Sequence, residues 1–313
     1  MKGLRFIPED TKVNFIGVRV VAFAMSAILL LGSLSLVATK GLNLGIDFVG
    51  GTAIEIRTPV MPDLPALRTS LNSLELGGIA IQEFGQPDDL LIRMPEQEGG
   101  IEVQQAAIAK VKAAIDATYP EQEVDYRRTE FVGPQVGEEL KMQGMYAVLF
   151  SMLGMLAYIW FRFEWQFGIA AVIALLHDSF ITIGLFALTQ MEFNLATVAA
   201  ILTIAGYSIN DTVVVFDRIR ENLRKYKKKP LIELFNLSIN QTLTRTVMTS
   251  VTTLIALIAL YVFGGEVIRG FIYALIFGVL IGTYSSIFVA SPILLYLNIR
   301  RTGSGEVKTE EAA

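Results

Sequence analysis

The sequence predicts an α-helical integral membrane protein with six transmembrane helices and one small α+β domain outside the membrane. The 313 residues have a mean hydropathy of +0.52, and 53% of them are hydrophobic while 18% are charged. A soluble domain has about 45–50% apolar and about 25% charged residues. The apolar residues are concentrated in runs of about 20, the length of helix that crosses a bilayer. Residues 39–141, between the first two runs, have instead the mixed polarity of a folded domain.

The hydropathy pattern predicts spanning helices at 17–38, 142–162, 166–189, 194–216, 243–264 and 269–298. The first of them raises the question of a cleaved signal peptide. Its apolar stretch, from Val18 to Val37, is longer than the apolar region of a typical signal peptide. An uncleaved anchor is therefore favoured, and cleavage stays the alternative.

Positive residues near the helix ends predict the orientation of the chain. The connections at 190–192 and 264–270 contain one positively charged residue, Arg269. The opposite helix ends carry Lys2, Arg5, Lys12, Arg19, Arg162, Arg218, Arg220, Arg224, Lys225, Lys227, Lys228, Lys229, Arg300 and Arg301. We therefore expect both termini, including the tail at 299–313, in the cytoplasm. The domain at 39–141 then faces outward, into the periplasm if the protein lies in the inner membrane of a Gram-negative cell.

The basic segment at 217–242, within the helical region 142–298, admits two interpretations. A basic cytoplasmic stretch commonly anchors the topology near anionic lipid. Its apolar positions Leu231, Ile232, Leu234, Phe235 and Leu237 also fit an amphipathic helix lying on the membrane surface. Docking of a cytoplasmic partner is a further possibility.

The outward segment has the pattern of a small ferredoxin-like sandwich. Alternating or helical spacing predicts, in order, a strand at 44–57, a helix at 63–76, strands at 79–84 and 89–94, a helix at 101–118 stopped by Pro120, and a strand at 123–131. This β-α-β-β-α-β order is that of the ferredoxin-like fold. Gly50 and Gly51 are expected to form a bulge or bend in the first strand, since no GxxxxGK[ST] motif of a phosphate loop surrounds them.

Composition excludes several classes of site. The chain has no cysteine and one histidine, so thiol chemistry, disulfides and a multi-histidine metal centre are excluded. No nucleophile is paired with a base, so no enzyme and no cofactor are expected. A net charge of −4 gives no reason to expect nucleic acid as a partner.

Polar residues inside the fourth predicted helix are the first candidate site. A charge in a spanning helix costs at least about 2.5–3.5 kcal/mol. Thr203, Tyr207 and Asp211 follow at a spacing of four and share one face, with Asn210 beside them. Asp211 is either a proton-carrying carboxylate or a fixed partner that locks helices together. Asp217 lies at the interface, where a solvated side chain is expected.

The fifth and third helices carry further candidates. Gln241, Arg245, Thr249 and Thr252 share one face, and Arg245 lies at a depth that makes a pairing with Asp211 plausible. Snorkelling of Arg245 to the interface is the alternative. The face suggests a hydrated interior or a helix contact.

His177 and Asp178 lie near the centre of the third helix. Because they are adjacent, they project about 100° apart and are not expected to form a unit by themselves. Asp178 is assigned either to proton traffic or to an interhelical hydrogen bond. In the last helix, Gly278 and Gly282 form a small-xxx-small face that predicts close packing.

Four motifs in order resemble the SecF branch of the SecD/SecF family, which belongs to the RND superfamily. They are LGIDFVGGT at 44–52, VGP at 132–134, GYSINDTVVVFDRIREN at 206–222 and the TRT step around Arg245. The resemblance covers nearly the whole chain, including the six-helix layout. It implies a bundle that is half of an RND-type transporter.

The resemblance also implies roles and partners. Asp211 and Arg245 match positions of the family's proton path, and Asn210 precedes Asp211 in the same ND step. His177 and Asp178 match the family's HD pair in the third helix and complete the proton-path candidates. Asp47 belongs to the first motif, where a structural role at the root of the domain is expected, as for Gly50, Gly51, Asp217 and Arg218. The implied partners are SecD, the SecYEG channel, other accessory membrane subunits and a translocating unfolded polypeptide, with protons as the coupling ion.

Two other functions compete with this one. A small-molecule or lipid exporter of the same superfamily usually holds twelve helices in one polypeptide, so a chain with six needs a partner or a dimer. A structural assembly factor, the second rival, would use its membrane charges only to lock helices. It predicts that a neutral substitution of Asp211 changes stability and not proton coupling.

Overall fold

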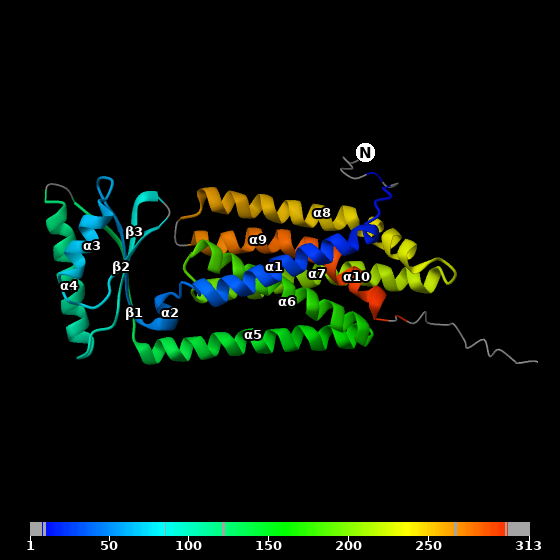
Figure 1. Cartoon of the computed structure of the whole chain (residues 1–313), viewed down its shortest axis with the longest axis horizontal. Coiled ribbons are helices and arrows are strands. Elements are labelled where there is room, and N and C mark those ends of the chain that lie inside the picture. The colour runs from blue at the N-terminus through cyan, green and yellow to red at the C-terminus, as the bar shows by residue number, and fades with distance from the viewer. Residues whose placement is uncertain are drawn as a thin grey trace, which may run out of the picture. The chain divides into compact units, whose positions relative to one another are not determined.

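The computed structural model of the chain describes residues 8, 11–84, 86–120, 123–265, 268–297 and 299 (Figure 1). Lys2, Arg5, Arg300 and Arg301, which contributed to the predicted orientation, lie outside the described residues, as does position 85 between two strands. The chain divides into two compact units. A helical unit comprises Met1–Leu42, Val148–Met191 and Ala199–Ala313, and the second unit comprises Asn43–Ala147 and Glu192–Val198.

Six helices among the described residues are long and apolar enough to cross a membrane, which confirms the predicted fold class. The helical segments are α1 Arg19–Lys40 preceded by a 3-10 turn Ile16–Val18, α5 Pro134–Arg162, α6 Trp165–Thr189, α7 Leu195–Lys225, α8 Leu231–Phe263 and α9 Arg269–Ser285. A π-helical turn Ser286–Ala290, α10 Ser291–Ile293 and a 3-10 turn Leu294–Tyr296 continue α9. Apart from the groups in its first and last turns, the backbone polar groups of a helix are bonded within it, which is what a lipid environment demands.

Of the two interpretations of 217–242, the structure does not support an amphipathic helix that lies by itself on the membrane surface. Helix α7 continues to Lys225, and α8 begins at Leu231 and runs without a break through the fifth span. Leu234 and Phe235 are fully buried and belong to a core cluster that includes Phe167 and Phe216. The rings of Phe167 and Phe216 meet edge to face with centroids 5.2 Å apart. Protein therefore covers Leu234 and Phe235, whereas Ile232 of the same predicted face is 45% exposed.

The first turns of α8 also hold the segment that precedes α1. The side-chain amide of Asn240 accepts a hydrogen bond from the Val13 amide at 3.0 Å and donates one to the Val13 carbonyl at 2.9 Å. Asn236 accepts from the Ile16 amide at 2.9 Å. Part of the 217–242 segment thus binds residues 13–16 of its own chain.

The second unit contains a four-stranded antiparallel sheet with the strand order β2-β3-β1-β4. Its elements are β1 Gly51–Arg57, α3 Leu64–Asn72, β2 Ala80–Phe84, β3 Gln86–Met94, α4 Ile101–Thr118 and β4 Asp125–Val132. Strands β1 and β2 are both antiparallel to β3, which lies between them, so they are parallel to each other. This is the split βαβ arrangement of the predicted ferredoxin-like sandwich.

Both helices of this unit cover one face of the sheet (Figure 1). Alternate strand residues such as Ile54, Ile56 and Ile92 point to that face and are fully buried. They pack against Leu67 of α3 and Val111 of α4, which are also fully buried. Apolar residues at every second position of the strands, and at helical spacing in 101–118, therefore form this core.

The predicted first strand is wrong over residues 46–49. Ile46–Val49 forms a short helix, α2, and β1 begins only at Gly51. Gly50 and Gly51 have φ angles of 72° and 107°, which residues with a side chain rarely adopt. A Cβ on Gly51 would lie 2.5 Å from the carbonyl oxygen of Met94. The glycine pair is thus the junction between a helical turn and a strand that lies tightly against β3.

Candidate functional site

Two carboxylates are buried inside the helical unit. Asp178 of α6 is completely buried, and Asp211 of α7 is 7% exposed. A spanning helix carries such a charge at a cost, so the groups around it decide what it can do. In both cases the neighbours with hydrogen bonds to the carboxylate are hydroxyl groups, and in one case also a histidine.

Asp178 binds groups from three helices. Its Oδ2 atom accepts hydrogen bonds from the hydroxyls of Ser208 in α7, at 2.5 Å, and Ser285 in α9, at 2.7 Å. Its Oδ1 atom lies 2.9 Å from Nδ1 of His177. The expectation that His177 and Asp178 would not form a unit is therefore wrong. Adjacent residues leave a helix about 100° apart, but these side chains are long enough to turn toward each other.

The other face of His177 is apolar. Its ring stacks on Tyr284, with centroids 6.2 Å apart, and its Nε2 atom is buried without a hydrogen-bond partner among the described residues. Within the part of the chain that the structure describes, the histidine is thus hydrogen-bonded through Nδ1 alone.

Asp211 has a different set of donors. Its Oδ1 atom accepts from Thr246 of α8 at 2.7 Å, and its Oδ2 atom accepts from Ser286 at 2.6 Å. One turn earlier in α7, the hydroxyl of Tyr207 donates a hydrogen bond to the hydroxyl of Ser250 in α8 at 3.2 Å. The predicted polar face of α7 therefore continues across helix interfaces from Tyr207 to Asp211, while Asn210 is exposed.

Consecutive residues of one helix connect the two carboxylates. Ser285 donates to Asp178 and Ser286 donates to Asp211. The π-helical turn begins at Ser286, and π-bulges in helices frequently occur at functional sites. Sequence reasoning missed both serines, because serine in a spanning helix is common and its partner is set by packing. Among the described residues, the shortest chain of contacts between the two carboxylates therefore runs through two adjacent residues.

The expected ion pair between Arg245 and Asp211 is absent among the described residues. Arg245 is exposed, as are Gln241, Thr249 and Thr252 of the same predicted face. The face of α8 that enters the bundle is one residue further round the helix and contains Thr242, Thr246 and Ser250, all buried. A step of one residue turns the helix by about 100°, which is why a pattern of polar residues alone pointed to the wrong side.

Asp217 and Arg218 lie at the end of α7 and are both ion-paired. Asp217 binds Arg162 of α5 at 2.9 Å, and Arg218 binds Glu221 at 2.9 Å. Their side chains are about half exposed, so each pair contributes roughly 0–1 kcal/mol. The first pair connects α5 with α7, the second lies within α7, and neither is bonded to the buried carboxylates.

Small residues bring the helices of the buried site together. A Cβ on Gly278 would clash with the side chain of Ile204 in α7, and one on Gly282 would lie 3.1 Å from Cβ of Ser208. The predicted Gly278-x-x-x-Gly282 face therefore packs on α7, as expected. This close approach places Ser208 and Ser285 within reach of the same carboxylate oxygen.

A second cluster lies in the other unit, where the segment at 43–51 meets the start of α7. Asp47 Oδ2 accepts a hydrogen bond from the Leu195 amide at 2.9 Å, in the first turn of α7. Asn194 caps the same helix by accepting from the Thr197 amide at 3.1 Å. Leu44 and Phe193 form a parallel bridge beside them. Asp47 thus stabilises the first turn of α7, as a carboxylate at a helix N-terminus does.

Charged groups of the sheet surround this junction. Arg93 of β3 donates to the Leu44 carbonyl at 2.8 Å and to Asn43 Oδ1 at 2.5 Å. Burial raises the pKa of the nearby Glu192 above its usual range, and the positive charge of Arg93 opposes that rise. The negative charges of Asp47 and Glu55 add to it. The surroundings of Glu192 therefore disfavour the charged form of its carboxyl group.

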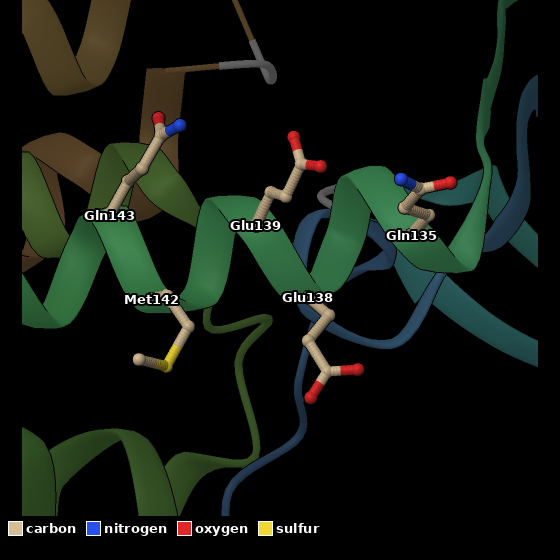
Figure 2. Close-up of a pocket in the computed structure, with 5 residues that line it drawn as sticks. All are labelled: Gln135, Glu138, Glu139, Met142 and Gln143. Atoms are coloured by element: carbon tan, nitrogen blue, oxygen red, sulfur yellow. The ribbon is translucent and has the colours of Figure 1, made fainter.

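The described residues contain no group of three His, Cys, Asp or Glu side chains that could hold a metal ion. An open hollow of about 360 Å³ lies along the first turns of α5, lined by Gln135, Glu138, Glu139, Met142 and Gln143. Figure 2 shows that Glu138 points away from Glu139, toward the opposite side of the helix. The two carboxylates therefore do not converge in this hollow.

Two family models match the chain. The model described as "Protein export membrane protein SecD/SecF, C-terminal" matches residues 110–300, and the model "SecD/SecF GG Motif" matches residues 35–58. The second match contains Asp47, Gly50 and Gly51. The first contains both buried carboxylates and all their hydroxyl partners.

Relatives and solved structures match nearly the whole chain. It is 47% identical to a protein translocase subunit SecF of Rickettsia felis, over 93% of this chain and 94% of the relative. It is also 47% identical to a protein of the same name from Cereibacter sphaeroides, over 96% of this chain and 94% of that relative. The crystal structure of SecDF, a translocon-associated membrane protein from Thermus thermophilus, matches with a TM-score of 0.85 and 38% identity over 94% of this chain. A crystal structure of SecDF in a super-membrane-facing form matches with a TM-score of 0.67 and 38% identity over 92% of this chain. The chain spans 40% and 39% of these two structures.

Proposed function

Because the chain belongs to the SecD/SecF family of protein export membrane proteins, we propose that it is a proton-driven subunit of the Sec export machinery. It is a multi-pass protein of the inner membrane. In the proposed role it pairs with a SecD subunit and assists the SecYEG channel. Protons that cross its buried site move the domain at 43–147, which faces the periplasm and pulls on the translocating polypeptide. Both termini then lie in the cytoplasm.

The observation that carries this proposal is the environment of Asp211. The carboxylate is buried in a spanning helix, and its hydrogen bonds come from the neutral hydroxyls of Thr246 and Ser286. A neutral donor does not fix the charge as an arginine would, so Asp211 can gain and lose a proton. On protonation the carboxylate becomes a donor, and the hydroxyls of Thr246 and Ser286 must turn.

Helix α7 provides the route from the proton to the domain. It runs from Leu195 to Lys225 without a break and carries Asp211. Its first turn is bonded to Asp47 of the segment that leads into β1. A shift of α7 on protonation of Asp211 therefore acts directly on the root of the sheet. One charge that crosses 100 mV supplies about 2.3 kcal/mol, and a few are enough to bias a two-state motion.

The two matching SecDF structures support such a motion. They have the same identity to this chain and nearly the same coverage, yet their TM-scores are 0.85 and 0.67. Those two structures therefore differ from each other in conformation.

The test is export of a secreted precursor into inverted membrane vesicles that contain Asp211→Asn. Asp217→Asn is the matched control, because it removes the same charge from the exposed end of the same helix. Co-purification of the SecD subunit checks assembly in each case. We expect the proton gradient to stimulate export in the control and not in Asp211→Asn. Normal assembly with unchanged stimulation in Asp211→Asn would leave the chain a structural assembly factor.

A further inference from the structure

The C-terminal ends of α5 and α7 form a hollow with an excess of positive charge. Its volume is about 520 Å³, and it is lined by Arg162, Asp217, Arg220, Glu221, Arg224 and Lys225. Four of these side chains are cationic and two are carboxylates. All of them belong to the helical unit. The hollow is separate from the buried carboxylates and has no part in the proposed proton path.

The two carboxylates of the hollow are already neutralised by arginine. Asp217 binds Arg162 at 2.9 Å, and Glu221 binds Arg218, which does not line the hollow, at 2.9 Å. Arg220, Arg224 and Lys225 therefore have no carboxylate partner among the described residues. Three uncompensated cations around one hollow favour an anionic ligand.

Arg220 still has hydrogen-bond donors to offer. Its Nη1 atom donates to the Arg162 carbonyl at 3.0 Å, and its Nε atom has no acceptor among the described residues. The guanidinium lies over the ring of Phe163, with its central carbon 5.9 Å from the ring centroid. A planar fork held in this way is suited to an oxygen anion such as a phosphate.

The place of the hollow along the helices identifies the source of the phosphate. Helix α7 has 31 residues and is about 46 Å long at 1.5 Å per residue, whereas the hydrocarbon layer is about 30 Å thick. Its last turns therefore lie at the level of the lipid headgroups. Nearby on α5, the side chains of Tyr158, Trp160 and Phe161 are 55%, 68% and 95% exposed. Aromatic side chains of this kind are enriched where headgroups meet acyl chains.

We propose that this hollow binds the phosphate of an anionic phospholipid. Arg220, Arg224 and Lys225 hold the phosphate oxygens, and the acyl chains lie against the exposed aromatic side chains near the end of α5. A diffuse basic surface would bind any anionic membrane according to its net charge. In this proposal, the preference for anionic lipid depends instead on Arg220, Arg224 and Lys225, which line the hollow between α5 and α7.

The chain reports on this site without a label, because its two tryptophans are Trp160 and Trp165, on either side of Arg162. The purified full-length chain is reconstituted in phosphatidylcholine vesicles. Phosphatidylglycerol with brominated acyl chains is then titrated in, with brominated phosphatidylcholine as the reference lipid. Quenching of the tryptophan fluorescence gives the relative affinity of the two lipids.

We expect phosphatidylglycerol to quench at lower fractions than phosphatidylcholine. Arg224→Gln with Lys225→Gln should reduce that preference about tenfold, the effect of losing a hydrogen bond or two to a charged group. Both side chains are exposed, so the fold should persist. Lys227→Gln with Lys228→Gln removes the same charge from outside the hollow and should change the preference less than about twofold.

Three results would overturn the proposal. The wild type could show no preference between the lipids, or both double variants could lose it equally, which would make the effect one of net charge. Alternatively, Arg224→Gln with Lys225→Gln could keep the lipid preference and lose a co-purifying protein, which would assign the hollow to an acidic protein partner. Arg220→Gln, with its melting temperature checked, repeats the test at the least exposed of the three cations.

Discussion

Loss of the Asp47 carboxylate should loosen the first turn of α7 and uncouple it from the sheet. In Asp47→Ala the Leu195 amide loses the acceptor that now lies 2.9 Å away. Removal of a capping side chain costs about 0.5–2 kcal/mol, and loss of a negative charge at a helix N-terminus about 0.3–1 kcal/mol. The total is about 1–3 kcal/mol, or roughly five- to 150-fold in the opening equilibrium of that turn.

Hydrogen exchange of peptides that cover 193–198 measures this opening. Asp47→Asn keeps an oxygen acceptor and loses only the charge, so it should show the smaller part of the effect. Asp63→Ala is the matched control, since Asp63 caps α3 of the same domain by accepting from the Ala66 amide at 3.1 Å. It should loosen α3 and leave α7 protected.

The functional consequence separates coupling from stability. Asp47→Ala should reduce stimulation of export by the proton gradient, while Asp63→Ala should not. Unchanged exchange at 193–198 in Asp47→Ala would show that its hydrogen bond does not hold the helix. Equal losses of export in Asp47→Ala and Asp63→Ala would refute the reasoning that the contact with α7 is what transmits the motion.

Three further perturbations test other parts of the structure. Gly278→Ala places a methyl group against Ile204 and should destabilise the helical unit by about 1–3 kcal/mol, seen as a lower melting temperature in detergent; an unchanged value would contradict the packing. Asp89→Asn replaces a buried carboxylate by a neutral amide. This weakens the ion pair with Arg57, which donates two hydrogen bonds to the carboxylate, at 2.7 and 2.8 Å. A buried pair costs about 3–5 kcal/mol to break, and partial exposure of Arg57 reduces this to about 2 kcal/mol, measurable by urea unfolding of the domain. Because burial raises the folded-state pKa of Glu192, the folded state loses stability as the pH rises above the usual value near 4.5. Glu192→Gln should therefore slow hydrogen exchange at 193–198 at pH 8 and leave it nearly unchanged at pH 4; faster exchange at pH 8 would show that ionised Glu192 stabilises the junction.

The spanning helices could be predicted from the sequence because lipid leaves the backbone few alternatives. A long apolar segment in a bilayer must bond all its amides internally, so hydropathy alone identifies a helix. The domain was predictable for a different reason, since its strands and its second helix keep strict periods up to clear stop signals such as Pro120. In both cases a local pattern determines a local structure.

The parts that could not be predicted depend on packing between segments. Which hydroxyl meets Asp211 is decided by the rotation of α8, and one residue separates the buried Thr246 from the exposed Arg245. Ser285 and Ser286 carry no signal in a spanning helix until α6, α7 and α9 are assembled around them. The α2 turn escaped prediction because Gly50 and Gly51 leave the extended conformation with positive φ angles, and glycine accepts either conformation.

The arrangement of hydrogen bonds favours a coupling role for the two carboxylates over a purely structural one. A cation beside a buried carboxylate favours its charged form and so opposes the uptake of a proton. Asp178 and Asp211 are bonded instead to serines, a threonine and a histidine, which can exchange donor and acceptor roles when a proton arrives. The adjacent Ser285 and Ser286 each donate to one of the two carboxylates, so the two sites share one turn of the same helix. In the proposed mechanism, helix α7, which carries both Asp211 and the amide bonded to Asp47, passes the effect of a proton at this pair of sites to the root of the sheet.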